Sequence, residues 1–341
     1  MPPPMSLPIW KPDARRAAAT HMAAFTQRAT REPGPDLPRG GSLRTGDYDL
    51  LWRWSIRHPA RFWEMVWDFC DVRASRTADQ VLRDAPRMPG ARWFEGAELN
   101  FAENLLKQGR LRPSADAPAL IALDESGRRR ELSLAQLRER VRAVAAALKA
   151  DGVGPGDRVA GFLPNTLEAL IAMLATASLG AIWSSCSPDF GLQGVLERFG
   201  QIAPKVLFAC DGYRYAGKPV DTRERIAQVC AALPDLKRLV IVEFLDERPQ
   251  LAGLRGAVRF VQYEAPGELA FAQLPFDHPL YILYSSGTTG APKCIVHGAG
   301  GTLIQHLKEL MLHTDVQPGD RLFFYTTCGW MMWNWLVSGL A

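Results

Sequence analysis

The chain has 341 residues, of which 47% are apolar and 22% are charged, and its formal net charge is +4. This length and composition are typical of a globular protein with two or three domain-sized units. A net charge this small excludes a strongly basic surface, so we expect no nucleic-acid partner. The six cysteines are widely spread, without zinc-ligand or redox spacing, which favours buried free thiols in a reducing compartment over a metal site or disulfides.

No stretch of the sequence predicts secretion or a membrane span. Residues 1–11 lack the apolar core of a signal peptide. Residues 169–183 are uncharged but too few for a span of about 20 residues. The uncharged residues 323–341 are interrupted by polar side chains, which favours a strand and loop entering a core. Arginines between residues 15 and 31 weakly favour a mitochondrial transit peptide, but Asp13 opposes it, and we expect a cytoplasmic location.

The first hundred residues contain an arm and then aromatic helices. Residues 1–44 are rich in Pro, Gly and Arg, and we expect an extended N-terminal arm there. Residues 48–67 place apolar and aromatic side chains at helical spacing with a break at Pro59, which indicates packing rather than ligand stacking. Residues 92–96 predict a loop, followed by a short helix that Asn100 caps.

From residue 118 the pattern alternates between strands and helices. We expect strands at 119–123, 158–163, 181–185, 205–209 and 239–243, and helices at 133–150, 165–179, 191–201 and 221–232. Ser133, with Gln136 three residues later, is typical of a capping box. Such alternation predicts an α/β fold with a layered parallel sheet covered on both faces.

The run from Tyr284 to Lys293 predicts a polyphosphate-binding loop. The apolar residues 280–284 indicate a buried strand immediately before it. Glycines allow close backbone approach to an anion, hydroxyls donate hydrogen bonds, and a lysine adds a mobile charge. The residues with these properties are Ser285, Ser286, Gly287, Thr288, Thr289, Gly290 and Lys293. The spacing is not that of a Walker A motif, and a plain Ser/Thr/Gly turn with a solvated lysine is the alternative.

With this loop, five further segments resemble the adenylate-forming (AMP-binding) superfamily, in its acyl-CoA synthetase branch. The closest similarity is to the enzymes of that branch that activate acetoacetate. The segments are residues 7–12, 52–67, 88–94, 99–106 and 180–191. The resemblance implies an acid–thiol ligase that uses ATP, Mg²⁺ and coenzyme A, with acetoacetate as the acid. It also implies the large domain of the adenylate-forming fold, preceded by an aromatic-rich helical segment.

The resemblance further implies roles for individual residues. Ser285 to Lys293 would hold the ATP phosphates, with Thr288 and Lys293 as catalytic residues and no protein ligand for the metal. The segment with Trp330, Met331, Met332 and Asn334 would form the wall of the acyl pocket, with core packing as the alternative. Arg214 and Lys218 would contact coenzyme A, with solvated surface charge as the alternative. His297 would line the site or serve a structural role.

The resemblance also predicts three parts of the chain: an arm (1–44), a helical segment (45–107) and an incomplete AMP-binding domain (108–341). The later motifs of the family and its C-terminal lysine-bearing domain are absent from this sequence, so we expect an N-terminal fragment that is inactive by itself. Alternatives are a ligase for acetate or propionate, and a non-catalytic nucleotide-binding remnant.

Overall fold

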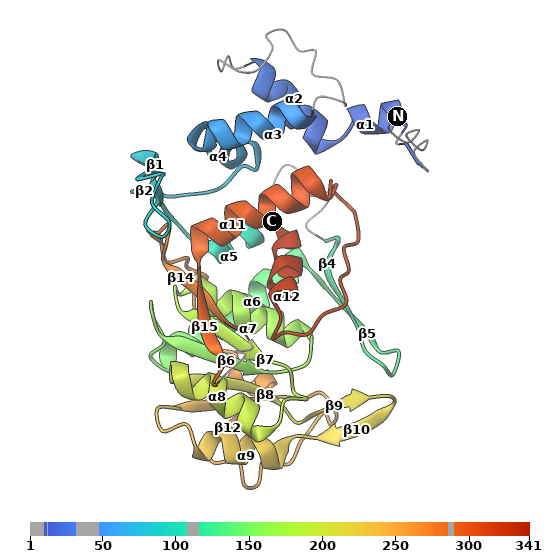
Figure 1. The fold of residues 1–341 in the computed structure, drawn as a ribbon. Helices are drawn as coiled ribbons and strands as arrows, with labels where there is room; N and C mark the ends of the chain where they lie inside the picture. The colour runs from blue at the N-terminus through green and yellow to red at the C-terminus, as the bar shows by residue number, and fades with distance from the viewer. Residues whose placement is uncertain (1–9, 12, 32–47, 108–115, 286–289) are drawn as a thin grey trace, which may run out of the picture. The chain divides into compact units, whose positions relative to one another are not determined.

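The computed structural model describes residues 10–11, 13–31, 48–107, 116–285 and 290–341 (Figure 1). They belong to two compact units. Unit 1 comprises Met1–Val72 and Leu307–Gln317, and unit 2 comprises Arg73–His306 and Pro318–Ala341. The expected helical segment at 45–107 is therefore divided between the two units at Val72.

Unit 1 is helical and is built around aromatic side chains. Phe25 is fully buried, and its ring meets those of Phe62 and Phe69 edge to face at 5.9 and 5.4 Å. Within the predicted stretch, packing is confirmed for Trp54 and Phe62, whose rings meet at 6.3 Å, whereas Trp52 is 50% exposed. The elements are α1 (Ala14–Ala18), α2 (His21–Arg31), α3 (Tyr48–Arg57), α4 (Pro59–Phe69) and the π-helix η1 (Glu309–His313).

The extended arm expected over residues 1–44 is wrong for residues 14–31, which are helical. The Asp13 side chain accepts hydrogen bonds from the backbone N–H groups of Arg15 and Arg16 and so caps α1. Helix α2 then buries Phe25, Ala29 and Thr30. The apolar positions of this stretch are few, and their tertiary contacts stabilise the helix where composition favoured a loop.

A seven-stranded sheet forms the centre of unit 2. Its order is β12-β11-β8-β6-β7-β14-β15, with all neighbours parallel except the antiparallel pair β14–β15. The strands are β6 (Arg158–Phe162), β7 (Ile182–Cys186), β8 (Val206–Cys210), β11 (Arg238–Val242), β12 (Ala257–Arg259), β14 (Pro279–Ser285) and β15 (Lys293–Gly298). This confirms the predicted parallel-sheet α/β fold.

Helices cover both faces of this sheet (Figure 1). One layer contains α6 (Leu134–Ala150) and α7 (Leu167–Ser178), and the other contains α8 (Leu192–Ile202) and α9 (Arg223–Ala231). Ser133 and Gln136 form the predicted capping box at the start of α6. Every residue of α7 is buried, so residues 169–178 of the uncharged stretch form part of a core helix. No helix among the described residues is both long enough and apolar enough to cross a membrane.

Smaller elements complete unit 2. Two-stranded antiparallel pairs are formed by β1 with β2, β3 with β13, β4 with β5, and β9 with β10. Their bounds are β1 (Gln80–Arg83), β2 (Arg92–Glu95), β3 (Glu98–Leu99), β4 (Pro118–Leu123), β5 (Arg129–Ser133), β9 (Gly212–Tyr215), β10 (Lys218–Asp221) and β13 (Leu274–Pro275). The remaining helices are α5 (Phe101–Leu106), α10 (Phe260–Tyr263), α12 (Met331–Val337), the 3-10 helix η2 (Ser338–Leu340) and α11 (Ala299–Lys308), whose last two residues belong to unit 1.

Two local expectations are corrected. Residues 92–95 form a strand rather than a loop, because they pair with β1. The strand β15, which begins at Lys293, pairs with β14 and extends the main sheet. The described residues 318–330 contain no strand, although the apolar run at 323–325 favours one, because none of the described strands pairs with it.

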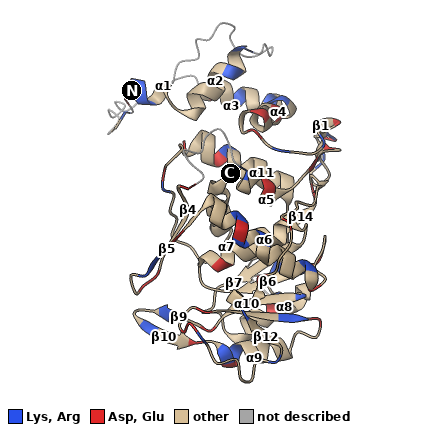
Figure 2. Ribbon diagram, turned by 180° about the vertical axis from the view of Figure 1, so that it is seen from behind, with Lys and Arg blue, Asp and Glu red and all other residues tan. Residues whose placement is uncertain are grey.

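Acidic and basic residues are distributed over several elements of unit 2 (Figure 2). Three pairs link distant segments: Arg130 with Glu168, Lys205 with Asp157, and Arg238 with Asp151. These pairings agree with the small net charge of the chain.

Candidate nucleotide and acid site

The ends of the candidate phosphate loop are held by the antiparallel pair β14–β15. Ser285 lies opposite Lys293, and Tyr284 lies opposite Cys294. The predicted residues Ser286, Gly287, Thr288 and Thr289 lie outside the described residues. Gly290 has a φ of +104°, a backbone conformation that a residue with a Cβ rarely adopts. The structure thus brings Ser285 and Lys293 together at the two ends of the loop.

Lys293 is the first residue of β15, and its side chain is exposed. It makes no ion pair with any of the described residues. A lysine ammonium in this position can follow an anion that enters the loop, because its charge is not neutralised by a neighbouring carboxylate.

The strand order reverses beside β6. From β6 the chain passes to β7 on one side, and from β7 it returns to β8 on the other side. In open α/β sheets such a reversal creates a crevice at the carboxyl ends of the strands, where ligands bind. By this rule a ligand crevice is expected beyond Phe162 and Cys210, the last residues of β6 and β8.

Three hydrogen bonds attach the candidate acyl-pocket segment to the carboxyl ends of β6 and β7. Ser185 Oγ donates to the carbonyl oxygen of Cys328 at 2.6 Å. Trp333 Nε1 donates to Asn165 Oδ1 at 2.9 Å, and Cys328 Sγ donates to the carbonyl oxygen of Pro164 at 3.4 Å. Residues 328–333 consequently lie at the edge of the sheet where a ligand crevice is expected.

The four predicted acyl-pocket residues do not share one environment. Trp330 and Met331 are 67% and 45% exposed, and Met332 is half-buried. Asn334 is 1% exposed, and neither polar atom of its amide has a hydrogen-bond partner among the described residues. The structure places Trp330 and Met331 at the surface and turns Asn334 to the interior beside Trp333.

The candidate coenzyme A residues lie on the β9–β10 hairpin. Arg214 pairs with Pro219, and Tyr215 pairs with Lys218. Because side chains alternate between the two faces of a strand pair, Arg214 and Lys218 lie on opposite faces of the hairpin. They do not form a single flat cationic surface, and a phosphate contact by both would have to be made around the hairpin's end.

His297 lies on β15, where its ring is 4.9 Å from that of Tyr281. Burial lowers the pKa of His297, which favours the neutral imidazole at pH 7. This environment agrees with packing against Tyr281.

The described residues hold no group of three or more His, Cys, Asp or Glu side chains suited to a metal ion. The donor chemistry near the loop consists of hydroxyls and an ammonium, which suits a Mg²⁺ ion that arrives on the nucleotide's phosphates. The absence of a protein ligand set for Mg²⁺ stays a prediction.

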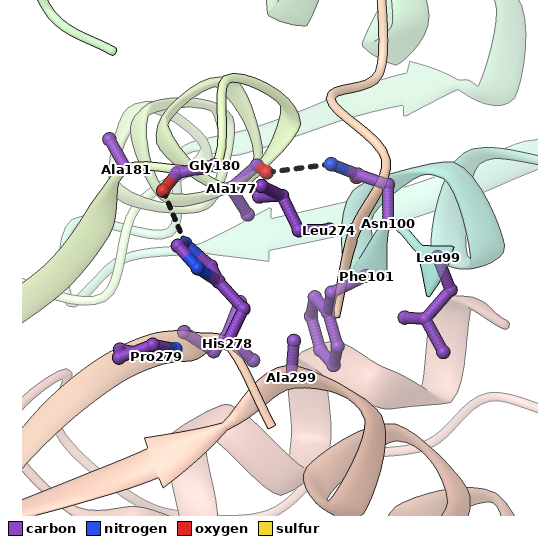
Figure 3. Close-up of a pocket in the computed structure, with 11 residues that line it drawn as sticks. Leu99, Asn100, Phe101, Ala177, Gly180, Ala181, Leu274, His278, Pro279 and Ala299 are labelled. Carbon is purple, nitrogen blue, oxygen red and sulfur yellow. Dashed lines mark hydrogen bonds between the residues drawn. The ribbon is translucent and has the colours of Figure 1, made fainter. Parts of the chain in front are cut away.

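A small pocket in unit 2 is lined by 11 residues, which do not include Ser285, Gly290 or Lys293 (Figure 3). Its open volume is about 10 Å³, roughly the space of one water molecule. Asn100 Nδ2 donates to the carbonyl oxygens of Ala177, Ser178 and Ala272 at 2.9–3.2 Å. His278 Nε2 lies 2.8 Å from the carbonyl oxygen of Gly180. The pocket is far too small for a nucleotide, and its polar groups hold the surrounding segments together.

Comparisons with known proteins identify the family. Residues 107–340 match the model of AMP-binding enzymes, and residues 48–105 match that of the acetyl-coenzyme A synthetase N-terminus. The chain belongs to the AMP-binding enzyme family. It is similar to an acetoacetyl-coenzyme A synthetase of Rhizobium meliloti, with 47% identity over 98% of this chain and 50% of the relative.

Two further similarities support this assignment. A malonamoyl-CoA synthetase of Penicillium aethiopicum is 46% identical over 98% of this chain and 46% of its own length. The solved structure of an acetoacetyl-CoA synthetase from Streptomyces lividans matches with a TM-score of 0.89 and 46% identity, covering 98% of this chain and 50% of that one. The chain thus spans about half the length of the relatives that it matches. The resemblance to acetoacetate-activating ligases is confirmed.

Sequence reasoning missed the contribution of α8 to the site. Arg198 and Gln201, on its last turn, contact residues at the two ends of the loop. The only signal in the sequence is their spacing of three, which places two long polar side chains on one helical face.

Proposed function

We propose that this chain is the nucleotide- and acid-binding part of an ATP-dependent acid–CoA ligase that activates acetoacetate. The observation that carries the proposal is the pair Ser285–Lys293, which closes a glycine- and hydroxyl-rich loop at the end of β14. A loop of this kind suits the phosphates of ATP, since backbone N–H groups, hydroxyls and one ammonium all favour a polyanion.

The proposed reaction has two steps. The carboxylate of acetoacetate attacks the α-phosphate of ATP, which gives acetoacetyl-adenylate and releases pyrophosphate. The thiol of coenzyme A then attacks the acyl carbon, and AMP leaves. Phosphoryl chemistry of this kind depends mainly on positioning and on neutralising charge. Lys293, Thr288 and the other loop residues would hold the departing diphosphate, and bound Mg²⁺ would share its negative charge.

The names of the relatives support a short acid with a carbonyl group at its third carbon. Acetoacetate and malonamate, the acids implied by those names, both have this group and differ only in a terminal methyl or amino group. Met331 and Met332 would provide an adaptable apolar wall for such an acid. Arg214 and Lys218 would contact coenzyme A. We place this activity in the cytoplasm, in the use of acetoacetate as a ketone body, without a nucleic-acid partner.

The proposal can be tested with a chimaera in which residues 1–341 are joined to the second half of the Rhizobium meliloti relative. We expect CoA-dependent consumption of ATP with acetoacetate, and much less with acetate or propionate. A preference for acetate would overturn the choice of acid, and ATP binding without turnover by the chimaera would favour a non-catalytic remnant.

The 341-residue chain without this addition should bind ATP and produce no acetoacetyl-CoA. Turnover by the chain alone at the rate of the chimaera would overturn that expectation. The control is the chimaera with Lys293→Ala, which should lose activity and keep its fold.

A further inference from the structure

The two ends of the candidate phosphate loop receive little support from the sheet itself. β15 is the last strand of the sheet, and residues 293–296 along it are exposed. On the other side, β14 pairs with β7 at a single position, Tyr281 with Trp183. Beyond that position the Ser184 hydroxyl donates to the carbonyl oxygen of Ile282 at 2.9 Å, so a side chain continues the link between the strands.

The last turn of α8 contacts the first end of the loop through Tyr284. The Tyr284 hydroxyl is 3.0 Å from Ser184 Oγ and 3.3 Å from the carbonyl oxygen of Arg198. The Arg198 guanidinium lies over two rings, at 5.6 Å from the centre of Tyr284 and 4.6 Å from that of Phe190. Burial raises the pKa of the Tyr284 hydroxyl, so it remains a proton donor at all working pH values.

The same turn contacts the second end through Gln201. Its Nε2 donates to the carbonyl oxygen of Pro292 at 2.9 Å. Its Oε1 accepts a hydrogen bond from Cys294 Sγ at 3.6 Å. Arg198 and Gln201 are three residues apart and therefore lie on one face of the helix. Cys294 is itself paired with Tyr284 across the hairpin, so the contacts of α8 form a closed set around the ends of the loop.

We propose that Arg198 and Gln201 form a loop clamp that positions Ser285 and Lys293 for ATP. This inference rests on the function proposed above and adds two positioning residues to it. The clamp acts through the loop, since it fixes the separation and direction of the two strand ends from which the loop residues extend. Its loss weakens binding of the nucleotide because Ser285 and Lys293 must then be brought into position at the expense of binding free energy.

Cys294 provides a test of the clamp that does not depend on ATP. It is the one exposed cysteine of the six; Cys230 is half-buried, and the other four are buried. Gln201→Ala and Tyr284→Phe should each raise the rate of Cys294 alkylation by iodoacetamide, measured by mass spectrometry of the peptide, by about threefold to tenfold. The matched control is Gln193→Ala, which removes an exposed glutamine of the same helix that bonds the side chain of Glu197, and it should leave the rate unchanged.

The second measurement is the affinity for MgATP by isothermal titration calorimetry, with the thermal midpoint recorded for each variant. Gln201→Ala and Tyr284→Phe should weaken binding by about fivefold, and Gln193→Ala should not. Gln201→Glu should not restore the affinity, because a carboxylate cannot donate to the Pro292 carbonyl oxygen.

Each other outcome counts against a defined part of the proposal. An unchanged Cys294 rate in Gln201→Ala overturns the clamp. A raised rate with unchanged ATP affinity overturns its role in positioning. If the unaltered chain and Lys293→Ala bind no ATP while Cys294 still responds, the proposed nucleotide function fails, and with it the purpose assigned to the clamp.

Discussion

Removing Arg130 should reverse the effect of pH on the stability of unit 2. Glu168 lies in the first turn of α7 with a side chain that is 11% exposed, and Arg130 donates to its two carboxylate oxygens at 2.6 and 2.8 Å. Burial by itself would raise the pKa of Glu168, but the hydrogen bonds and charge of Arg130 outweigh burial and lower it. The ionised pair therefore stabilises the fold above the ordinary pKa of a glutamate, near 4.5, and this stability is lost as the pH falls.

Arg130→Met leaves a buried carboxylate without its partner. The expected loss is about 3 kcal/mol at pH 7, the lower end of the range for breaking a buried pair, because the Arg130 side chain is 34% exposed. For a unit of this size the thermal midpoint should fall by about 6–12 °C. Burial then raises the pKa of Glu168 above that of the unfolded chain. The variant should become less stable as the pH rises from 5 to 8.

The measurement is thermal unfolding followed by circular dichroism at pH 5, 6, 7 and 8. Arg130→Met/Glu168→Leu should recover most of the loss, since apolar side chains can replace a buried ion pair at little cost. Arg76→Met is the matched control. Arg76 also donates to both oxygens of a carboxylate, Asp79, but the two side chains are 53% and 67% exposed, so its loss should cost less than about 1 kcal/mol. The reasoning is refuted if Arg130→Met keeps the pH dependence of the unaltered protein.

Three further outcomes are expected. In urea unfolding, Asn100→Asp should lower the free energy of unfolding more than Asn100→Ala does. The aspartate carboxylate would face the three carbonyl oxygens that the amide now bonds, whereas alanine only removes the hydrogen bonds. Equal losses of stability in the two variants would contradict this prediction. Gly300→Ala should lower the free energy of unfolding by about 1–3 kcal/mol in thermal unfolding, because the new Cβ would lie 2.1 Å from the Phe276 ring. Gly301→Ala is the matched change in the same helix. Its Cβ would have nothing within 4 Å, so it should raise the free energy of unfolding by up to about 1 kcal/mol. Lys293→Ala should weaken MgATP binding about tenfold or more. The thermal midpoint should not change, because the Lys293 side chain is exposed. An affinity equal to that of the unaltered chain would show that Lys293 does not bind the nucleotide.

The sequence alone determined the elements whose signals are local. Alternating apolar runs predicted the central strands and helices, Ser133 with Gln136 marked the start of α6, and Asn100 capped α5 as expected. The phosphate loop could also be recognised, because its glycines, hydroxyls and lysine are contiguous in the chain. The apolar run before the loop predicted β14, whereas β15 after it was not predicted.

Only the tertiary structure decided which distant residues meet. The burial of Phe25 among aromatic rings stabilises a helix in a segment whose composition favoured an arm. The strand register of the β9–β10 hairpin separates Arg214 from Lys218, since alternating side chains place the two residues on opposite faces of the hairpin. The packing of α12 buries Asn334 in the interior. The contacts of Gln201 with Pro292 and Cys294 join positions about ninety residues apart. No local pattern encodes them, because they depend on how α8 packs against the end of the sheet.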